Sequence, residues 1–144
     1  MSPNFIENGV VVKSPVRIIL IGEHIDYNGG YVLPAAINLY VTLKIYKTNN
    51  TLCTVSSEHG GTLTFDIKQP LKASATQWEN YILGVVDGLK KKRPGQLVGF
   101  DCDISSELPI GAGISSSAAL ECGLAKGLNS LFDLGLEDIE LIEI

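Results

Sequence analysis

The amino-acid sequence predicts an α+β fold in which helices pack on one face of a single sheet. Three observations predict it. The first half of the chain is rich in short alternating apolar segments, the second half changes to helical spacing, and no linker or internal repeat separates the two halves. With 144 residues, 45% of them apolar and 19% charged, the chain is large enough to bury a core. We therefore expect one domain over residues 1–144.

Strands are predicted throughout the first half. Two β-branched runs, at 10–12 and 18–21, predict separate strands interrupted at Ser14 and Pro15. Apolar and polar residues alternate over 40–48, which predicts a strand with one buried face. Further strands are expected at 52–56 and 62–67, joined by a glycine-containing turn, and at 97–104.

A first helix is predicted from Thr76 to the proline at position 94. Thr76 and Glu79 have the spacing of a capping box, and Pro94 cannot continue a helix. The basic residues at 90–93 suit the negative end of the helix dipole. The expected buried face consists of Trp78, Tyr81, Ile82, Val85, Val86 and Leu89.

A second helix is predicted from about Ser115 to Gly135, and a short third helix from near Leu136. Acidic residues in the first turns of the third segment favour a helix start there. The apolar stripe expected to be buried on the second helix consists of Leu120, Leu124, Leu128, Leu131 and Phe132.

Charge and cysteine content narrow the class of protein. The formal net charge of −5 predicts no broad attraction to nucleic acid or to an anionic membrane surface. Cys53, Cys102 and Cys122 are widely spaced and odd in number, which argues against a disulfide framework and suits a reducing cytoplasm. We expect no membrane span, and a cytoplasmic location.

The segment 108–119, LPIGAGISSSAA, has the features of a phosphate cradle. Gly111 and Gly113 let the backbone approach a ligand closely, and Ser115 to Ser117 open the predicted helix, where unpaired N–H groups favour an anion. It matches neither a Walker A loop nor a complete dinucleotide fingerprint. A glycine-rich turn followed by ordinary serine capping is the alternative.

A second polar segment follows the run at 18–21. Glu23, His24 and Asp26 are short donors and acceptors that could hydrogen-bond sugar hydroxyls in pairs. One alternative is a polar loop with His24 on the surface. Another is a metal site that uses these three residues and His59, although such ligand sets normally have stricter spacing or thiolates.

Three segments resemble known motifs. Residues 21–37, IGEHIDYNGGYVLPAAI, resemble the galactokinase signature, whose usual form is IGEHTDYNGGFVLPMAI. Residues 108–120 resemble the LPxGxGLSSSAALE motif of GHMP kinases, and 78–86 resemble the WxNYxxGVx segment of the same superfamily. The motifs occur in family order, so the chain is identified by resemblance as an amino-terminal portion of the galactokinase family.

The resemblance implies a fold and an activity. The fold would be a truncated amino-terminal domain of GHMP kinases, similar to domain 2 of ribosomal protein S5. The activity would be transfer of the ATP γ-phosphoryl group to the anomeric hydroxyl of D-galactose with Mg²⁺. Galactose and ATP would then be the partners, and neither nucleic acid nor a membrane would be one.

The resemblance also implies roles for individual residues. Glu23, His24 and Asp26 would recognise galactose, and Arg17 would be catalytic near the transferred phosphoryl group. Trp78 would lie near adenine, with a role as core anchor of its helix as the alternative. The nucleotide-binding loop would consist of Gly111, Ala112, Gly113, Ile114, Ser115, Ser116 and Ser117, and the last of these would also bind Mg²⁺.

The sequence departs from the family in two respects. Val16 and Ile18 stand where the family normally has Gly and Asn, which restricts the backbone beside Arg17 and removes an amide. The family's catalytic Asp and acidic Mg²⁺ ligand would lie beyond Ile144, so we expect the chain by itself to be inactive and to self-associate. The alternatives are another GHMP sugar kinase, such as one acting on N-acetylgalactosamine, and a non-catalytic sugar-binding or regulatory module.

Overall fold

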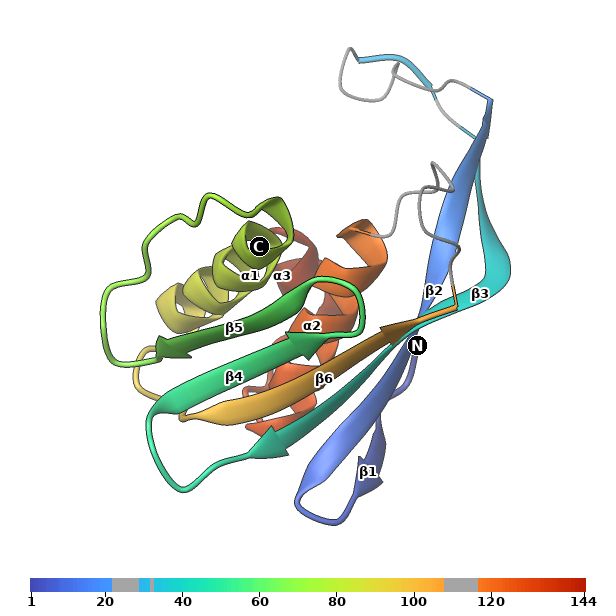
Figure 1. Ribbon diagram of the computed structural model, residues 1–144. Coiled ribbons are helices and arrows are strands. Elements are labelled where there is room, and N and C mark those ends of the chain that lie inside the picture. The colour runs from blue at the N-terminus through green and yellow to red at the C-terminus, as the bar shows by residue number, and fades with distance from the viewer. Residues whose placement is uncertain (22–28, 32, 108–116) are drawn as a thin grey trace.

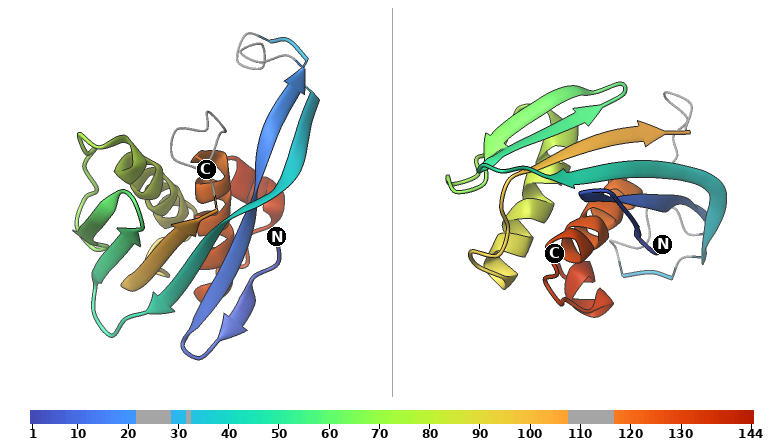
Figure 2. Two further views of the ribbon diagram at one scale, coloured as in Figure 1. Left: turned by 45° about the vertical axis from the view of Figure 1, so that its right-hand side comes forward. Right: turned by 90° about the horizontal axis from the view of Figure 1, so that it is seen from below.

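The computed structural model describes residues 1–21, 29–31, 33–107 and 117–144 and contains one six-stranded sheet covered by helices on one face (Figures 1 and 2). The strand order is β1-β2-β3-β6-β4-β5. The strands are β1 (Asn4–Ile6), β2 (Gly9–Ile21), β3 (Leu33–Lys47), β4 (Leu52–Ser57), β5 (Gly61–Asp66) and β6 (Phe100–Ser106). The helices are α1 (Gln77–Lys92), α2 (Ser117–Leu131) and α3 (Asp138–Ile142). This arrangement confirms the predicted α+β fold.

The predicted strand faces are confirmed where the sheet packs on the helices. In β3, Val41, Leu43 and Ile45 are buried, as the alternation over 40–48 predicts. β4 and β5 pair antiparallel, which confirms the hairpin, and β4 pairs with β6 in parallel. The sequence analysis did not predict β1, whose three residues are all exposed.

β2 is a single strand, so the prediction of two separate strands at 10–12 and 18–21 was wrong. Pro15 has no N–H and is tolerated because β1 pairs only as far as Val11, which leaves the outer side of β2 free at the proline. The register shifts between Pro15 and Arg17, which pair with Tyr40 and Ala36 respectively. β3 therefore has extra residues at this point, and such irregularities bend a strand.

Beyond the end of β6, β2 and β3 continue as a two-stranded arm that projects from the body (Figure 1). The last β6 residue, Ser106, pairs with Val41. Two hydrogen bonds close the junction. The Glu107 N–H donates to the Tyr40 carbonyl oxygen at 3.1 Å, and the Tyr40 N–H donates to Glu107 Oε2 at 2.8 Å.

The boundaries of α1 are confirmed, but its predicted capping box is absent. Thr76 is the N-cap residue, yet its side chain makes no capping hydrogen bond. Glu79 is instead hydrogen-bonded by the hydroxyl of Ser74, and the Asn80 side chain bonds the Ser74 backbone N–H and carbonyl oxygen, each at 2.8 Å. Ser74, in the segment before α1, therefore occupies the Glu79 carboxylate that the capping box would have used.

Buried side chains of both long helices meet those of the sheet in one core, and Phe100 is its largest fully buried side chain. The Phe100 ring makes edge contacts with Phe65 and Phe132, at centroid distances of 6.2 and 6.5 Å. The stripe predicted for α2 faces this core, with Leu124, Leu128 and Leu131 buried.

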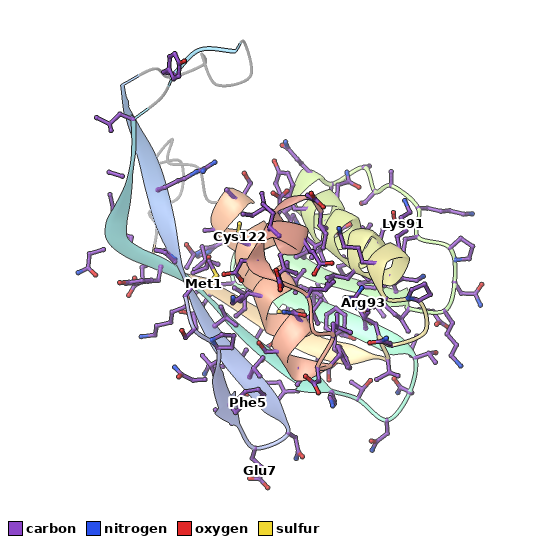
Figure 3. All side chains as sticks on the ribbon, turned by 180° about the vertical axis from the view of Figure 1, so that it is seen from behind. Met1, Phe5, Glu7, Lys91, Arg93 and Cys122 are labelled. Atoms are coloured by element: carbon purple, nitrogen blue, oxygen red, sulfur yellow. The ribbon has the colours of Figure 1, made fainter. Side chains whose placement is uncertain are left out.

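α3 packs beside α2 through Leu141, which is partly buried against the core, and through polar contacts. It begins at Asp138, and Glu137 and Glu140 form a reciprocal capping box. Arg93, at the end of α1, donates from Nε to the Leu134 carbonyl oxygen at 2.9 Å, near α3 (Figure 3). No side chain of α3 is buried, and Ile142 is 76% exposed.

The expected self-association of the chain stays a prediction. None of the described helices has the length and apolar character needed to cross a membrane.

Candidate functional site

Two strands and the loops that follow them lie together at one end of the sheet. β4 and β6 run in parallel and stop side by side, and the Glu58 N–H donates to the Ile104 carbonyl oxygen at 3.1 Å. The turn between β4 and β5 and the connection that leads from β6 to α2 therefore start at the same edge. The arm of β2 and β3 extends from this edge as well (Figure 1).

Two glycines of α2 show how this helix runs over the sheet. A Cβ atom on Gly127 would lie 2.5 Å from Ile45 Cδ1 and 3.1 Å from Val12 Cγ2. A Cβ atom on Gly123 would lie 2.7 Å from Leu43 Cδ1 and 3.0 Å from Ser14 Cβ. Going from Gly127 to Gly123, toward the start of α2, corresponds to going from Val12 to Ser14, toward the end of β2. The two elements are therefore antiparallel, and the N-terminus of α2 points toward the arm.

The same register brings Ser117 and Arg17 to one end of the molecule. Ser117, the first residue of α2, stands about 9 Å before Gly123 at 1.5 Å per helical residue. Arg17 stands about 10 Å beyond Ser14 at roughly 3.3 Å per strand residue. Because Ser14 and Gly123 are in contact, these matching displacements place Ser117 and the backbone of Arg17 at the same level, at the arm end of the sheet.

The charges at this end favour an anion. Arg17 is exposed, and among the described residues no ion pair of its guanidinium is found. The first turn of α2 contains no acidic residue, so its unpaired N–H groups keep their positive field. Glu121 follows on α2, and partial burial raises the pKa of its carboxyl group.

The two cysteines of the core do not contribute a reactive thiol. Burial raises the pKa of the Cys53 thiol to about 11, and burial also raises the pKa of Cys102. Both groups are therefore neutral near pH 7 and are poor nucleophiles and metal ligands in that form.

Trp78 lies at the start of α1, against the turn between β4 and β5. A Cβ atom on Gly60 would lie 3.0 Å from Cε2 and from Nε1 of the indole. The side chain is partly buried and packs against the core, as a core anchor would. Its Nε1 is buried, and the described residues offer it no hydrogen-bond acceptor. A role near adenine stays a prediction.

The other predicted site residues lie outside the described residues. These are Glu23, His24, Asp26, Gly111, Ala112, Gly113, Ile114, Ser115 and Ser116. Within the described ranges no group of three or more His, Cys, Asp or Glu side chains could hold a metal ion. His59 is exposed in the turn after β4, at 4.0 Å from the Glu58 carboxylate.

The contact between Ser14 and Gly123, which aligns α2 with β2, was not predicted from the sequence. Ser14 is fully buried, and its hydroxyl has no hydrogen-bond partner among the described residues. A weak indication was present in the sequence. Gly123 and Gly127 are one helical turn apart, at the spacing of the buried leucines of the same helix.

Two family models match different parts of the chain. The model described as "Galactokinase galactose-binding signature" matches residues 4–47, which include β1, β2 and β3. The model described as "GHMP kinases N terminal domain" matches residues 80–144, which include β6 and α2.

Curated relatives named galactokinase match over most of the chain. The galactokinase of Thermosipho africanus is 39% identical over 92% of this chain and 36% of its own length. That of Actinobacillus pleuropneumoniae is 38% identical over 91% of this chain and 35% of its own length. The chain thus spans about a third of the length of these relatives.

Solved structures agree with these matches. Lactococcus lactis galactokinase, solved in complex with galactose, superposes with a TM-score of 0.81 at 37% identity, over 92% of this chain and 35% of that one. Methanococcus jannaschii mevalonate kinase superposes with a TM-score of 0.76 at 23% identity, over 94% of this chain and 44% of that one. At that identity, the second match supports the fold alone.

Proposed function

Because the chain belongs to the galactokinase family of GHMP kinases, we propose that the whole protein transfers the γ-phosphoryl group of ATP to the anomeric hydroxyl of D-galactose. The bond between the γ-phosphorus and the β–γ bridging oxygen breaks, and a bond from that phosphorus to O1 of the sugar forms. ADP leaves, and the O1 proton passes to a base. By resemblance, this base is an aspartate beyond the position of Ile144.

The alignment of α2 on β2, with Gly123 against Ser14 and Gly127 against Val12, is the observation that supports this proposal. It favours a common site for Arg17 and the N-terminus of α2. Sequence separation alone gives no reason for this proximity. An anion held by the N–H groups of α2 would lie at the end of the sheet where Arg17 is exposed, which is the arrangement that phosphoryl transfer requires.

Each part of the chain has a distinct task in this proposal. The N–H groups at the start of α2 and in the loop before it bind and orient the nucleotide phosphates. The guanidinium of Arg17 stabilises the negative charge that develops on the transferred group. Glu23, His24 and Asp26 orient galactose by pairing with its hydroxyls, because short acceptors and donors bond vicinal hydroxyls in pairs.

The described residues fit a Mg²⁺ ion that is bound largely by the nucleotide. Within the described residues the hydroxyl of Ser117 is the proposed ligand, in addition to the acidic ligand that the resemblance places beyond Ile144. Mg²⁺ commonly takes few protein ligands together with phosphate oxygens and water. When bound, the ion would neutralise phosphate charge.

Val16, which departs from the family pattern, has a clear structural role. It is fully buried in the core, beside the point where the register of β2 and β3 shifts. Its side chain therefore gains apolar contacts that the family's glycine would not make. This packing favours a stable strand beside Arg17, so Val16 does not by itself favour the non-catalytic module.

The direct test is galactose-dependent ADP release by the full-length protein encoded by the source gene. We expect ADP release with galactose and less with N-acetylgalactosamine or glucose. A higher rate with N-acetylgalactosamine would identify the other sugar kinase. Galactose binding without ADP release, in a preparation that binds ATP, would identify a sugar-binding module instead.

Replacing Asp26 by alanine is expected to weaken sugar use far more than nucleotide use. Loss of a charged hydrogen-bond acceptor costs about 1.5–3 kcal/mol, so the KM for galactose should rise roughly 10-fold to 150-fold. The KM for ATP should change less than about threefold. Steady-state kinetics with each substrate varied in turn give both values, and equal losses for the two substrates would remove Asp26 from the sugar site.

Replacing Ser117 by alanine is expected to raise the Mg²⁺ concentration needed for half-maximal activity by about fivefold to tenfold. The hydroxyl would supply one of the few protein oxygens on the ion, whereas the helix N–H groups remain in place. Titration of Mg²⁺ at fixed ATP measures the effect. A Ser117→Thr variant retains the hydroxyl and should respond like the wild type, and an unchanged titration in Ser117→Ala would make Ser117 a helix-start residue only.

A further inference from the structure

The close contact between α2 and β2 depends on three small residues, Ser14, Gly123 and Gly127, which we call the α2–β2 seam. At the two glycines the helix itself contributes no side chain, and side chains of the strands fill the space. A Cβ atom at either position would fall within 2.5–2.7 Å of a leucine or isoleucine methyl group of β3. Real Cβ atoms do not approach so closely, so with alanines either the buried side chains of Leu43 and Ile45 or the helix itself would have to move.

Helix stability alone would favour other residues in the seam. Glycine is less favourable than alanine inside a helix, and α2 has two glycines one turn apart on its buried side. Gly84 of α1 is different, because a Cβ atom there would meet no atom within 4 Å. The glycines of the seam are therefore tied to the distance between helix and sheet, whereas Gly84 is not.

Ser14 gives an independent indication that size is restricted in the seam. It is the one polar side chain among the described residues that is fully buried, and its hydroxyl has no described partner. The hydroxyl oxygen lies 3.5 Å from the position of a Cβ atom on Gly123. A buried hydroxyl without a partner destabilises a fold, so the useful property of Ser14 is that its side chain is short.

We propose that the α2–β2 seam positions the N-terminus of α2 relative to Arg17 and so determines how tightly the nucleotide phosphates are held. Gly123 and Ser14 are the positioning residues. They act through the place of the helix and touch no ligand themselves. The inference rests on the proposed function, because it assumes that phosphates bind at the start of α2.

The positions of the two glycines predict unequal effects. Gly123 is closer to Ser117, so a methyl group there moves the anion-binding end of α2 directly. Gly127 lies one turn further along, against Val12 and Ile45, so a methyl group there mainly disturbs the middle of the interface. The two substitutions should destabilise the chain to a similar degree and differ in their effect on phosphate binding.

The experiment compares ligand binding by variants of the full 144-residue chain, using calorimetry with three probes: ATP with Mg²⁺, tripolyphosphate with Mg²⁺, and galactose. We expect Gly123→Ala to weaken binding of both phosphate compounds by about tenfold, the scale of one lost hydrogen bond to a charged group. Galactose binding should change less than about twofold. Gly127→Ala should weaken phosphate binding by less than about threefold.

Three further variants distinguish a change in helix position from a loss of stability. Gly84→Ala is the matched control and should bind all three probes like the wild type. Gly123→Ala combined with Leu43→Val removes the nearest clashing methyl group and should recover most of the phosphate affinity. Ser14→Val inserts bulk from the strand side and should reproduce the selective loss, which keeps the test possible if Gly123→Ala does not fold.

The outcomes are distinct. Wild-type affinity for phosphate compounds in both Gly123→Ala and Ser14→Val would overturn the positioning role and leave the proposed function intact. Equal losses of phosphate and galactose affinity, or equal phosphate losses in Gly123→Ala and Gly127→Ala, would show general destabilisation and would also overturn it. Failure of the wild type to bind either phosphate compound would overturn the proposed phosphate site together with the inference.

Discussion

Replacing Arg17 by alanine in the full-length protein is expected to lower kcat about a thousandfold, with a change of less than about fivefold in the KM for either substrate. An arginine that stabilises the transferred phosphoryl group contributes roughly 10³-fold or more to the rate, because the charge it opposes develops mainly in the transition state. Arg17 is exposed at the arm end of the α2–β2 interface, where the register supports an approach to the start of α2.

Steady-state kinetics at saturating galactose and ATP measure this effect, and two variants serve as references. Lys13→Ala removes another exposed cation of β2, at a position that pairs with Thr42 inside the body of the sheet, and should keep wild-type kcat. Arg17→Lys keeps the charge without the planar fork and should recover only part of the rate. A wild-type kcat in Arg17→Ala would exclude a catalytic role.

Replacing Phe100 by alanine is expected to lower the free energy of unfolding by about 3–5 kcal/mol. Phe100 is fully buried at the start of β6 and makes edge contacts with Phe65 and Phe132. Removing the ring loses both aromatic contacts and leaves a cavity between the sheet and the end of α2. Since small domains are stable by only about 5–15 kcal/mol, this substitution should bring the chain close to unfolding.

Urea denaturation followed by circular dichroism measures the loss, and Phe5→Ala is the matched control. Phe5 lies on β1 and is 72% exposed, so its removal should change stability by less than about 0.5 kcal/mol (Figure 3). A loss below about 1 kcal/mol for Phe100→Ala would mean that the core closes over the missing ring, contrary to the packing described here.

The sequence predicted those elements whose signals are local. The end of α1 was predicted correctly because a proline cannot continue a helix that precedes it. The hairpin of β4 and β5 was predicted because glycines lie between two alternating segments. The predicted capping box failed because the Ser74 hydroxyl takes both of its groups, donating to the Glu79 carboxylate and accepting from the Thr76 N–H. That competition depends on how the preceding loop is folded.

Elements that depend on neighbours distant in sequence were less predictable. Pro15 suggested an interruption, and only the short reach of β1 and the shift in β3 explain why β2 continues through it. The predicted approach of Arg17 to the phosphate loop likewise could not follow from sequence spacing. It depends on α2 lying antiparallel to β2, which Ser14 and Gly123 make possible. The sugar-recognition residues stay a prediction from the family motif.

The strand order also governs the sequence of events during synthesis. β1, β2 and β3 leave the ribosome first, as an antiparallel ribbon with Val10, Val12, Leu43 and Ile45 on one face. The inner neighbour of this ribbon, β6, follows only after β4, β5 and α1, and its main cover, α2, comes later still. The ribbon that carries the galactokinase signature is therefore the last part of the sheet to gain its apolar cover, and transiently exposed apolar surface of this kind makes a folding intermediate prone to aggregation.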